Sequence, residues 1–238
     1  MVVWVFAGGG ESEVAGLIPF LQKNFPGCKF ERKTPVKMKP GSKPDKKKSY
    51  GKTGKSLITE ISEKLPISLQ HELSKCDLIL VFDDLDCRDT ILQKQAFLDA
   101  ISKIPECADI KQFIVFAAPE LESWIIADWN NTIAKHPHFK GNREKRMRYW
   151  LSKEKNVNFD KPELFSEYDT EKDACREKLS KMLVESSEQD EDDRNKSRYS
   201  KGSHTPLFLR EIDPKEVQKK CPLFREFYLD LYNFCRAS

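Results

Sequence analysis

Closely spaced aspartates follow an apolar run in the first half of the chain, and their arrangement is typical of a metal site. Residues 78–82 read Leu-Ile-Leu-Val-Phe, and Asp83, Asp84 and Asp86 come directly after them. Such a run indicates a strand buried on both faces, and parallel sheets bind ligands at the carboxyl ends of their strands. Carboxylates this close repel one another unless a cation lies among them, and their hard oxygens suit Mg2+ or Mn2+. The alternative is that aspartate here only favours a turn or caps a helix.

The first apolar run, residues 2–6, also leads to a carboxylate. A Gly-Gly-Gly-Glu sequence ends at Glu11 and is followed by apolar residues at helical spacing, which predicts a strand, a glycine turn and a helix. Glycines that open a helix can cradle a phosphate, but Glu11 would repel that anion unless a metal lay between them. The dinucleotide-binding pattern fails, because its third glycine would fall on Glu13.

A third apolar run, residues 113–118, is followed by Pro119, Glu120 and Glu122. Proline and glutamate in a first helical turn are ordinary helix-start chemistry, which explains this motif when it is taken alone. Carboxylates follow three predicted buried strands, each time at the same end of the sheet. This recurrence is explained better by a shared site than by coincidence. The three motifs are therefore expected to converge.

Taken together, the motifs resemble the TOPRIM fold of topoisomerases, primases and OLD-type nucleases. The shared pattern is Gly-x-x-Glu after a first strand, Asp-x-Asp after a later one, and a glutamate after a further strand. A closer resemblance, over most of the chain, is to a TOPRIM-related bacterial family of unknown function that is often encoded beside an ATPase. It rests on Gly-Gly-Gly-Glu-Ser, Glu-Leu-Glu-Ser-Trp at residues 120–124, Tyr-Ser-Lys at residues 199–201 and a final Cys-Pro-Leu-Phe-Arg-Glu-Phe. Many relatives carry an acidic residue where this chain has Ala7.

The resemblance implies an α/β fold with a TOPRIM-like, mostly parallel sheet flanked by helices and a helical C-terminal extension. It implies metal-dependent hydrolysis of DNA or RNA, transfer RNA included, in bacterial phage defence with an ATPase partner. The expected ligands of Mg2+ or Mn2+ are Glu11, Asp84, Asp86, Glu120 and Glu122. The expected catalytic residues are Glu11, Asp84, Asp86, Glu120 and Lys201, whose ammonium would neutralise charge on the phosphate.

Other readings of the same residues stay open. His204 is a weaker candidate for proton transfer than the carboxylates. The lack of an acid at Ala7 leaves open a catalytically incomplete binding or regulatory subunit. A sugar-transferring enzyme could also use Asp-x-Asp, although the sequence shows no recognisable donor pocket.

Length and composition predict a cytoplasmic protein. The motifs and the resemblance imply a TOPRIM-like core at residues 1–128 and a mostly helical extension at residues 129–238 that packs on it. The chain has 238 residues, and no apolar segment approaches the roughly 20 residues that a membrane span needs. Its start lacks the features of an export signal. Seven cysteines without a Cys-x-x-Cys pair predict reduced thiols and no zinc finger. An acidic run at residues 185–193 is expected to be a linker.

Basic residues gather in two places, although 41 basic and 38 acidic residues nearly balance overall. Residues 32–55 are rich in lysine, proline and glycine, which predicts a loop that gathers phosphate backbone without reading sequence. The alternative is a solvated loop, and an apparent P-loop at residues 51–56 lacks its first glycine and its strand. A second basic segment with aromatic residues, at residues 143–155, is a helix candidate. The expected nucleic-acid-binding residues are Lys46, Lys47, Lys48, Lys52, Lys55 and Arg146.

Two features near the end of the chain are assigned structural roles. His136 and His138 flank Pro137, which indicates a turn rather than a metal pair. Apolar and aromatic residues from Phe224 to Cys235 recur at helical spacing and predict an amphipathic helix that packs on the core.

Overall fold

The computed structural model describes residues 1–35, 52–72, 76–189 and 197–236, except for the side chains of residues 11–13. These residues form two compact units. Unit 1 comprises Met1–Leu85, Asp89–Phe116 and Leu229–Ser238, and unit 2 comprises Asp86–Arg88 and Ala117–Tyr228. None of the helices in the described residues is long and apolar enough to cross a membrane.

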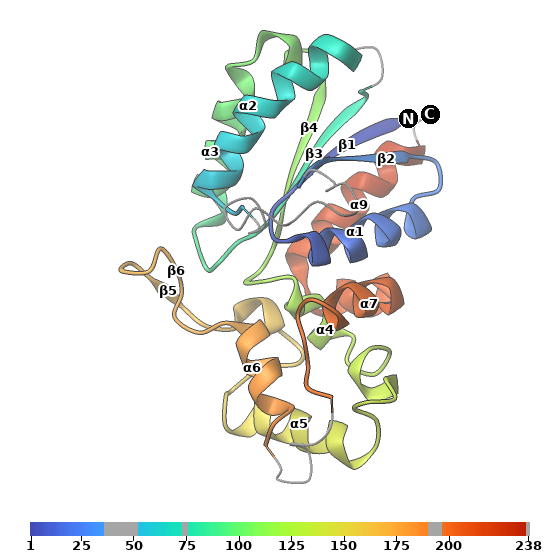
Figure 1. The fold of residues 1–238 in the computed structure, drawn as a ribbon, viewed down its shortest axis with the longest axis vertical. Helices are drawn as coiled ribbons and strands as arrows, with labels where there is room; N and C mark the ends of the chain where they lie inside the picture. Colours follow the sequence, from blue (N-terminus) through green and yellow to red (C-terminus); the bar gives the residue numbers. More distant parts are fainter. Residues whose placement is uncertain (36–51, 73–75, 190–196, 237–238) are drawn as a thin grey trace, which may run out of the picture. The chain divides into compact units, whose positions relative to one another are not determined.

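Unit 1 is built on a four-stranded parallel sheet, which confirms the expected α/β fold. The strand order is β2-β1-β3-β4, from β1 (Val2–Ala7), β2 (Lys29–Thr34), β3 (Leu78–Asp84) and β4 (Lys111–Ala117). The helices are α1 (Glu11–Asn24), α2 (Lys55–Glu72), α3 (Thr90–Ser102) and the short η2 (Pro105–Cys107). Figure 1 shows α2 and α3 on one side of the sheet and α1 on the other. This division follows from right-handed crossovers, because the chain reverses its direction across the sheet after β2.

The central strands are buried as their apolar sequences predict. Every residue of β3 is buried, and so are residues 3–7 of β1. In the parallel register between β1 and β3, Ala7 lies opposite Phe82. The Gly-x-x-Glu and Asp-x-Asp motifs therefore follow neighbouring strands at the same edge of the sheet.

The glycine turn after β1 makes room for a side chain of the protein itself. A Cβ at Gly8 would lie 2.1 Å from Oδ1 of Asp83, so only glycine fits there. Asp83 is fully buried, and its two oxygens accept hydrogen bonds from the backbone N–H groups of Asp84 (3.0 Å) and Gly54 (2.7 Å). Asp83 thus fastens the start of α2 to the end of β3.

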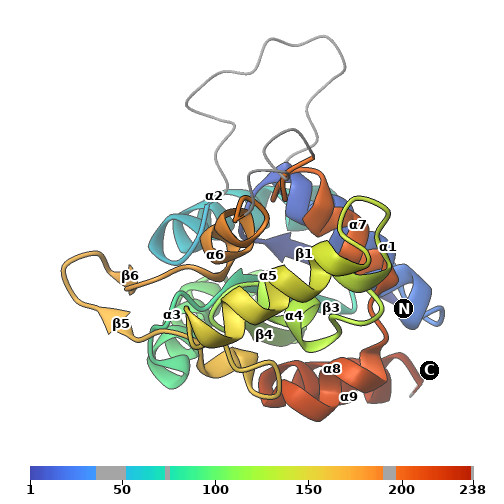
Figure 2. The ribbon, with the colours of Figure 1, turned by 90° about the horizontal axis from the view of Figure 1, so that it is seen from below.

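Unit 2 is mainly helical and has its own apolar core. Its helices are α4 (Glu122–Ala127), α5 (Asn142–Lys153), α6 (Leu179–Ser186), α7 (His204–Glu211), α8 (Pro214–Lys220) and the first part of α9 (Pro222–Arg236). The other elements are η3 (Ile133–Lys135), η4 (Pro162–Leu164) and the hairpin of β5 (Tyr168–Asp169) and β6 (Ala174–Cys175). The fully buried α4 contacts α6, α7 and α8, and α5 packs against α6 (Figure 2). Trp129, Phe139 and Phe208 belong to this core.

Several predicted elements are present. The second strand, the helix after the basic loop, the basic helix and the C-terminal helix correspond to β2, α2, α5 and α9. Residues 185–189, expected to begin a linker, form the end of α6 and the turn after it, whereas residues 190–196 lie outside the described residues. The predicted domains at residues 1–128 and 129–238 stay a prediction, because compactness alone does not show which segment folds independently.

The prediction of reduced cysteines is wrong for four of the seven. Cys28 is bonded to Cys235, and Cys87 is bonded to Cys175. The partners are 207 and 88 residues apart, so no local spacing could reveal them. Cys76, Cys107 and Cys221 are buried free thiols.

Candidate functional site

The predicted acidic residues are divided between the two units. Asp84, the last residue of β3, and Glu11, the first residue of α1, belong to unit 1. Asp84 is buried, with 8% of its surface exposed. The side chain of Glu11 lies outside the described part of the chain, so its convergence with Asp84 stays a prediction.

Asp86 belongs to unit 2 and has an unusual backbone. Asp86 and Cys87 have φ angles of 52° and 61°, a region in which residues other than glycine are uncommon. The backbone N–H of Asp86 donates to the carbonyl of Pro119 (2.9 Å), and the disulfide to Cys175 holds the next residue. Strained backbone of this kind is often found at functional sites.

The carboxylate of Asp86 faces two basic side chains. Its Oδ1 lies 3.1 Å from Nζ of Lys178, and its Oδ2 lies 3.5 Å from Nη1 of Arg88. The guanidinium of Arg88 also contacts Asp173. Asp86 is therefore held by two cations although it is almost fully buried.

Glu120 lies between two lysines. Its Oε1 is 3.9 Å from Nζ of both Lys178 and Lys201. The backbone N–H of Ser180 donates to its Oε2 (3.1 Å), and the Ser180 hydroxyl lies 3.1 and 3.2 Å from the two carboxylate oxygens. With 2% of its surface exposed, Glu120 is positioned by the start of α6 as well as by its own segment.

Glu122, the first residue of α4, completes the group from the other side. Its Oε2 lies 3.7 Å from Nζ of Lys201, and its Oε1 accepts a hydrogen bond from the hydroxyl of Thr205 (2.9 Å). The Thr205 hydroxyl also lies 2.8 Å from that of the buried Tyr199. Asp86, Glu120, Glu122, Lys178 and Lys201 are called the acid–lysine cluster below.

Burial sets the protonation behaviour of the acid–lysine cluster. Loss of hydration raises the pKa of Glu120, and the negative charge of Glu122 raises it further, while Lys201 opposes the shift. The pKa of Tyr199 is raised well above its ordinary value, mainly by burial and then by Glu122, so this phenol stays protonated. Carboxylic acids with a raised pKa suit proton transfer near neutral pH.

The lysines form the exposed side of the cluster. The side chains of Lys178 and Lys201 are 46% and 34% exposed, whereas those of Glu120 and Glu122 are 2% and 0% exposed. An anionic ligand would therefore meet two ammonium groups first and the carboxylates behind them.

The predicted nucleic-acid-binding residues are only partly described. Lys46, Lys47 and Lys48 lie outside the described residues. Lys52 forms an isolated backbone bridge with Gly9, and its Nζ is 4.0 Å from Glu60. Lys55 is the first residue of α2, and Arg146 is a half-buried residue of α5.

Sequence reasoning placed Lys201 near the carboxylates but missed Lys178, Ser180 and Thr205. Ser180 and Glu120 are 60 positions apart, and Thr205 and Glu122 are 83 apart. No short motif connects residues at that distance. One available signal was that Thr205 follows the Tyr-Ser-Lys motif by only a few residues.

Comparisons with known proteins place the chain in a family of unknown function and show no link to TOPRIM proteins or OLD-type nucleases. No curated protein and no solved structure matches the chain. Residues 32–232 match the model of a family described as Domain of unknown function (DUF4276). Because that model covers most of the sequence, the chain belongs to the DUF4276 family.

Proposed function

We propose that this protein is a metal-dependent nuclease that hydrolyses phosphodiester bonds in DNA or RNA. The observation that carries the proposal is the convergence of three carboxylates on the ammonium groups of Lys178 and Lys201. The resemblance to TOPRIM-like nucleases supports it from the sequence. Two partly exposed cations in front of buried acids suit a phosphate ester, whose negative charge grows during hydrolysis.

The donor set of the acid–lysine cluster suits Mg2+ or Mn2+. Asp86 and Glu120 already share one positive charge, because both lie within 4.0 Å of the same Nζ of Lys178. Hard carboxylate oxygens are the ligands that these ions prefer. Asp86 and Glu122 would hold the ion, which when bound lowers the pKa of a water molecule, and Glu120 would be left for proton transfer. Glu11 and Asp84 remain predicted ligands.

The residues of the cluster have separate roles in the proposed reaction. Lys178 and Lys201 bind the non-bridging oxygens of the phosphate. Glu120 accepts a proton from the attacking water as its oxygen bonds to phosphorus. The same carboxyl group then gives a proton to the leaving oxygen as the phosphorus–oxygen bond breaks. Its raised pKa suits both transfers.

The direct test is a cleavage assay with matched variants. Purified protein is incubated with duplex DNA, single-stranded DNA, RNA and transfer RNA, with and without Mg2+ or Mn2+. Glu120→Gln should reduce cleavage by at least about 100-fold, the scale expected for a lost catalytic group. Glu177→Gln, an exposed acid beside Lys178, is the control and should cleave like the wild type. Equal cleavage by the wild type and Glu120→Gln would contradict the proposal.

The setting is proposed from the resemblance alone. The protein would act in bacterial phage defence together with an ATPase, and any ATPase encoded beside it should be added to the assay. If activity appears only with that ATPase, the partner controls access of substrate or the active conformation. Activity without it would mean that the ATPase is not needed for the chemistry.

One observation favours a second candidate, a binding or regulatory subunit without its own activity. Each carboxylate of the acid–lysine cluster lies within 4.0 Å of a lysine, so the two lysines offset much of its negative charge without a metal. Ala7 also stands where many TOPRIM-like relatives carry an acid. Nucleic-acid binding without cleavage, across all metals and partners, would favour this candidate.

A further inference from the structure

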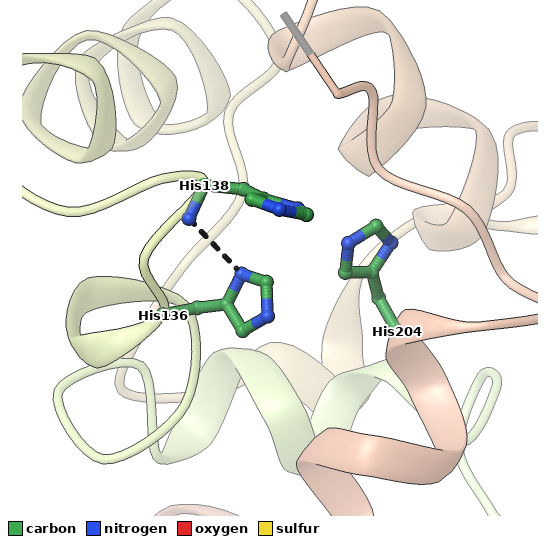
Figure 3. A group of neighbouring side chains, drawn as sticks. All are labelled: His136, His138 and His204. Atoms are coloured by element: carbon green, nitrogen blue, oxygen red, sulfur yellow. Dashed lines mark hydrogen bonds between the residues drawn. The ribbon is translucent and has the colours of Figure 1, made fainter.

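Three of the four histidines of the chain lie together in unit 2. His136 and His138 follow η3, and His204 is the first residue of α7. One possible ligand atom from each ring lies within 4.8 Å of the others. Figure 3 shows the three rings facing one another across a small space. His71, the fourth histidine, is an exposed residue of α2 in unit 1.

The backbone fixes the directions of two of these rings. Nδ1 of His204 accepts a hydrogen bond from the N–H of Ser200 (2.9 Å), and Nδ1 of His136 accepts one from the N–H of His138 (3.4 Å). With Nδ1 turned to the backbone, Nε2 is the nitrogen left for other partners. Among the described residues, none forms a hydrogen bond with Nε2 of any of the three rings.

Aromatic packing limits how far the rings can move. The ring of Phe139 lies 5.0 Å from that of His204, and the ring of Phe208 lies 5.3 Å from that of His136. Tyr199 stacks on His204 at 5.6 Å. His204 is buried and His136 is half-buried, but His138 is exposed. A small ion can therefore enter from the side of His138.

Burial favours the neutral form of two of the rings. Burial lowers the pKa of His136, and His138 lowers it further. Burial also lowers the pKa of His204, followed by the effects of His136 and His138, and Arg143 acts in the same direction. Neutral imidazole is the form that binds metals. The guanidinium of Arg143 opposes a nearby cation, but it donates to the carbonyls of His138 (2.7 Å) and Ser187 (2.9 Å).

We infer that His136, His138 and His204 form a binding site for a divalent transition-metal ion, with Zn2+ as the most suitable one. Imidazole nitrogens suit Zn2+, Cu2+ and Ni2+, whereas Mg2+ prefers oxygen. Three histidines around zinc leave a fourth position for water or another ligand. Tetrahedral zinc with bonds of about 2.0–2.1 Å places its ligand atoms roughly 3.3 Å apart. The possible ligand atoms lie within 4.8 Å of one another, and the exposed His138 has the most freedom to move toward that spacing.

Metal binding through Nε2 moves protons in a defined way. In the neutral ring of His204, Nδ1 accepts and Nε2 carries the proton, so binding at Nε2 transfers that proton to Nδ1 through solvent. The hydrogen bond from Ser200 is then lost, and the Ser203 hydroxyl, 3.4 Å from Nδ1, can accept the new N–H. His136 undergoes the same exchange and loses only the long hydrogen bond from His138. These losses lower the affinity without blocking the site.

The test is a metal titration of the full-length protein after removal of metals with EDTA. Zn2+ is titrated in competition with a chromogenic chelator, and Co2+ is followed by its visible absorption. The wild type should bind one equivalent. His136→Gln and His138→Gln should each weaken binding by about 100-fold, the upper end for disrupted metal sites. His71→Gln is the matched control and should bind like the wild type.

Four further outcomes make the result decisive, once circular dichroism shows that the variants are folded. Absence of a bound equivalent in the wild type would overturn the inference, and so would equal affinities of His138→Gln and His71→Gln. Loss of Zn2+ binding in Glu120→Gln, or competition by an excess of Mg2+, would place the ion at the carboxylates and also overturn it. Because no readout is nuclease activity, the histidine site can stand or fall independently of the proposed function.

Discussion

Acidic residues lie at the ends of the neighbouring strands β3 and β4, and their partners differ. In unit 1, Asp83 accepts hydrogen bonds from the backbone N–H groups of Gly54 and Asp84. In unit 2, Asp86 and Glu120 face lysines that come from distant parts of the chain. A buried carboxylate with neutral backbone donors stabilises the fold, whereas one with partly exposed cations can exchange them for a ligand. The partners of an acid, more than its place along a strand, therefore indicate which carboxylates could take part in the proposed function.

The largest expected effect is on activity. Asp86→Asn should lower cleavage by about 100- to 1,000-fold, because it removes one of the charges that would hold the metal. Its melting temperature should stay close to that of the wild type, since Asn keeps the size of the side chain. Cleavage rates and thermal melts of the same preparation test both statements. If Asp86→Asn melts at a much lower temperature but cleaves normally, Asp86 has a structural role like that given to Asp83.

Asp83→Ala should show the opposite pattern. It leaves the N–H groups of Gly54 and Asp84 without their acceptor in a buried place, which should cost about 3 kcal/mol of the free energy of unfolding. Urea denaturation measures this loss. If the stability falls by less than about 0.5 kcal/mol, Asp83 does not have the structural role given to it here.

Gly8→Ala tests the same contact from the other strand. The added Cβ would lie 2.1 Å from Oδ1 of Asp83, and the forced shift should cost about 2 kcal/mol. Gly202→Ala is the control, because the nearest atom to a Cβ there is 3.8 Å away. Combining Gly8→Ala with Asp83→Ala should give less than the sum of the two losses. Full additivity would mean that the residues act separately.

Glu120→Gln should stabilise the protein by roughly 1 kcal/mol at neutral pH. The folded protein raises the pKa of Glu120 above its ordinary value of 4.5, so the folded state binds this proton more tightly than the unfolded state does. The resulting penalty on folding is absent below pH 4.5, grows as the pH rises and is complete above the raised pKa. The gain from Gln should therefore shrink as the pH falls from 7 to 4.5. A gain independent of pH would argue against a carboxyl that is costly to ionise.

The smallest effect on stability is expected for Lys46, Lys47 and Lys48. Changing all three to Gln should alter the free energy of unfolding by no more than about 0.5 kcal/mol. Nucleic-acid binding should weaken equally for all sequences, and its salt dependence should flatten by a slope of about 0.7–0.9 for each lost contact. Fluorescence anisotropy at several ionic strengths measures this slope. If the slope does not change, Arg146 in α5 becomes the better candidate.

The sequence predicted the fold because the signals of the fold are local. Apolar runs marked β1, β3 and β4, and helical spacing marked α1 and α2. The Tyr-Ser-Lys motif also led to Lys201, although only through the resemblance. In each case a few neighbouring residues carry the information.

The remaining parts of the site depend on contacts between distant segments. Lys178 contacts Asp86 across 92 positions, and His204 lies near His136 across 68 positions. A His-Pro-His sequence is ordinary in a turn. It indicates a possible metal site only because the structure places the ring of His204 beside it. The role of Asp83 was hidden for the same reason, because its donor Gly54 lies in another segment.

The short segment at residues 199–205 contributes to both clusters of unit 2. Lys201 contacts Glu120 and Glu122, and Thr205 donates a hydrogen bond to Glu122. His204, which lies between Lys201 and Thr205 in the sequence, belongs to the proposed histidine site. An ion that moves His204 therefore shifts groups that hold the carboxylates. Thermodynamic linkage then requires reciprocity: if zinc changes the affinity of the acid–lysine cluster for its ligand, that ligand changes the affinity for zinc by the same factor. Through this one short segment, binding at either site would change the affinity of the other.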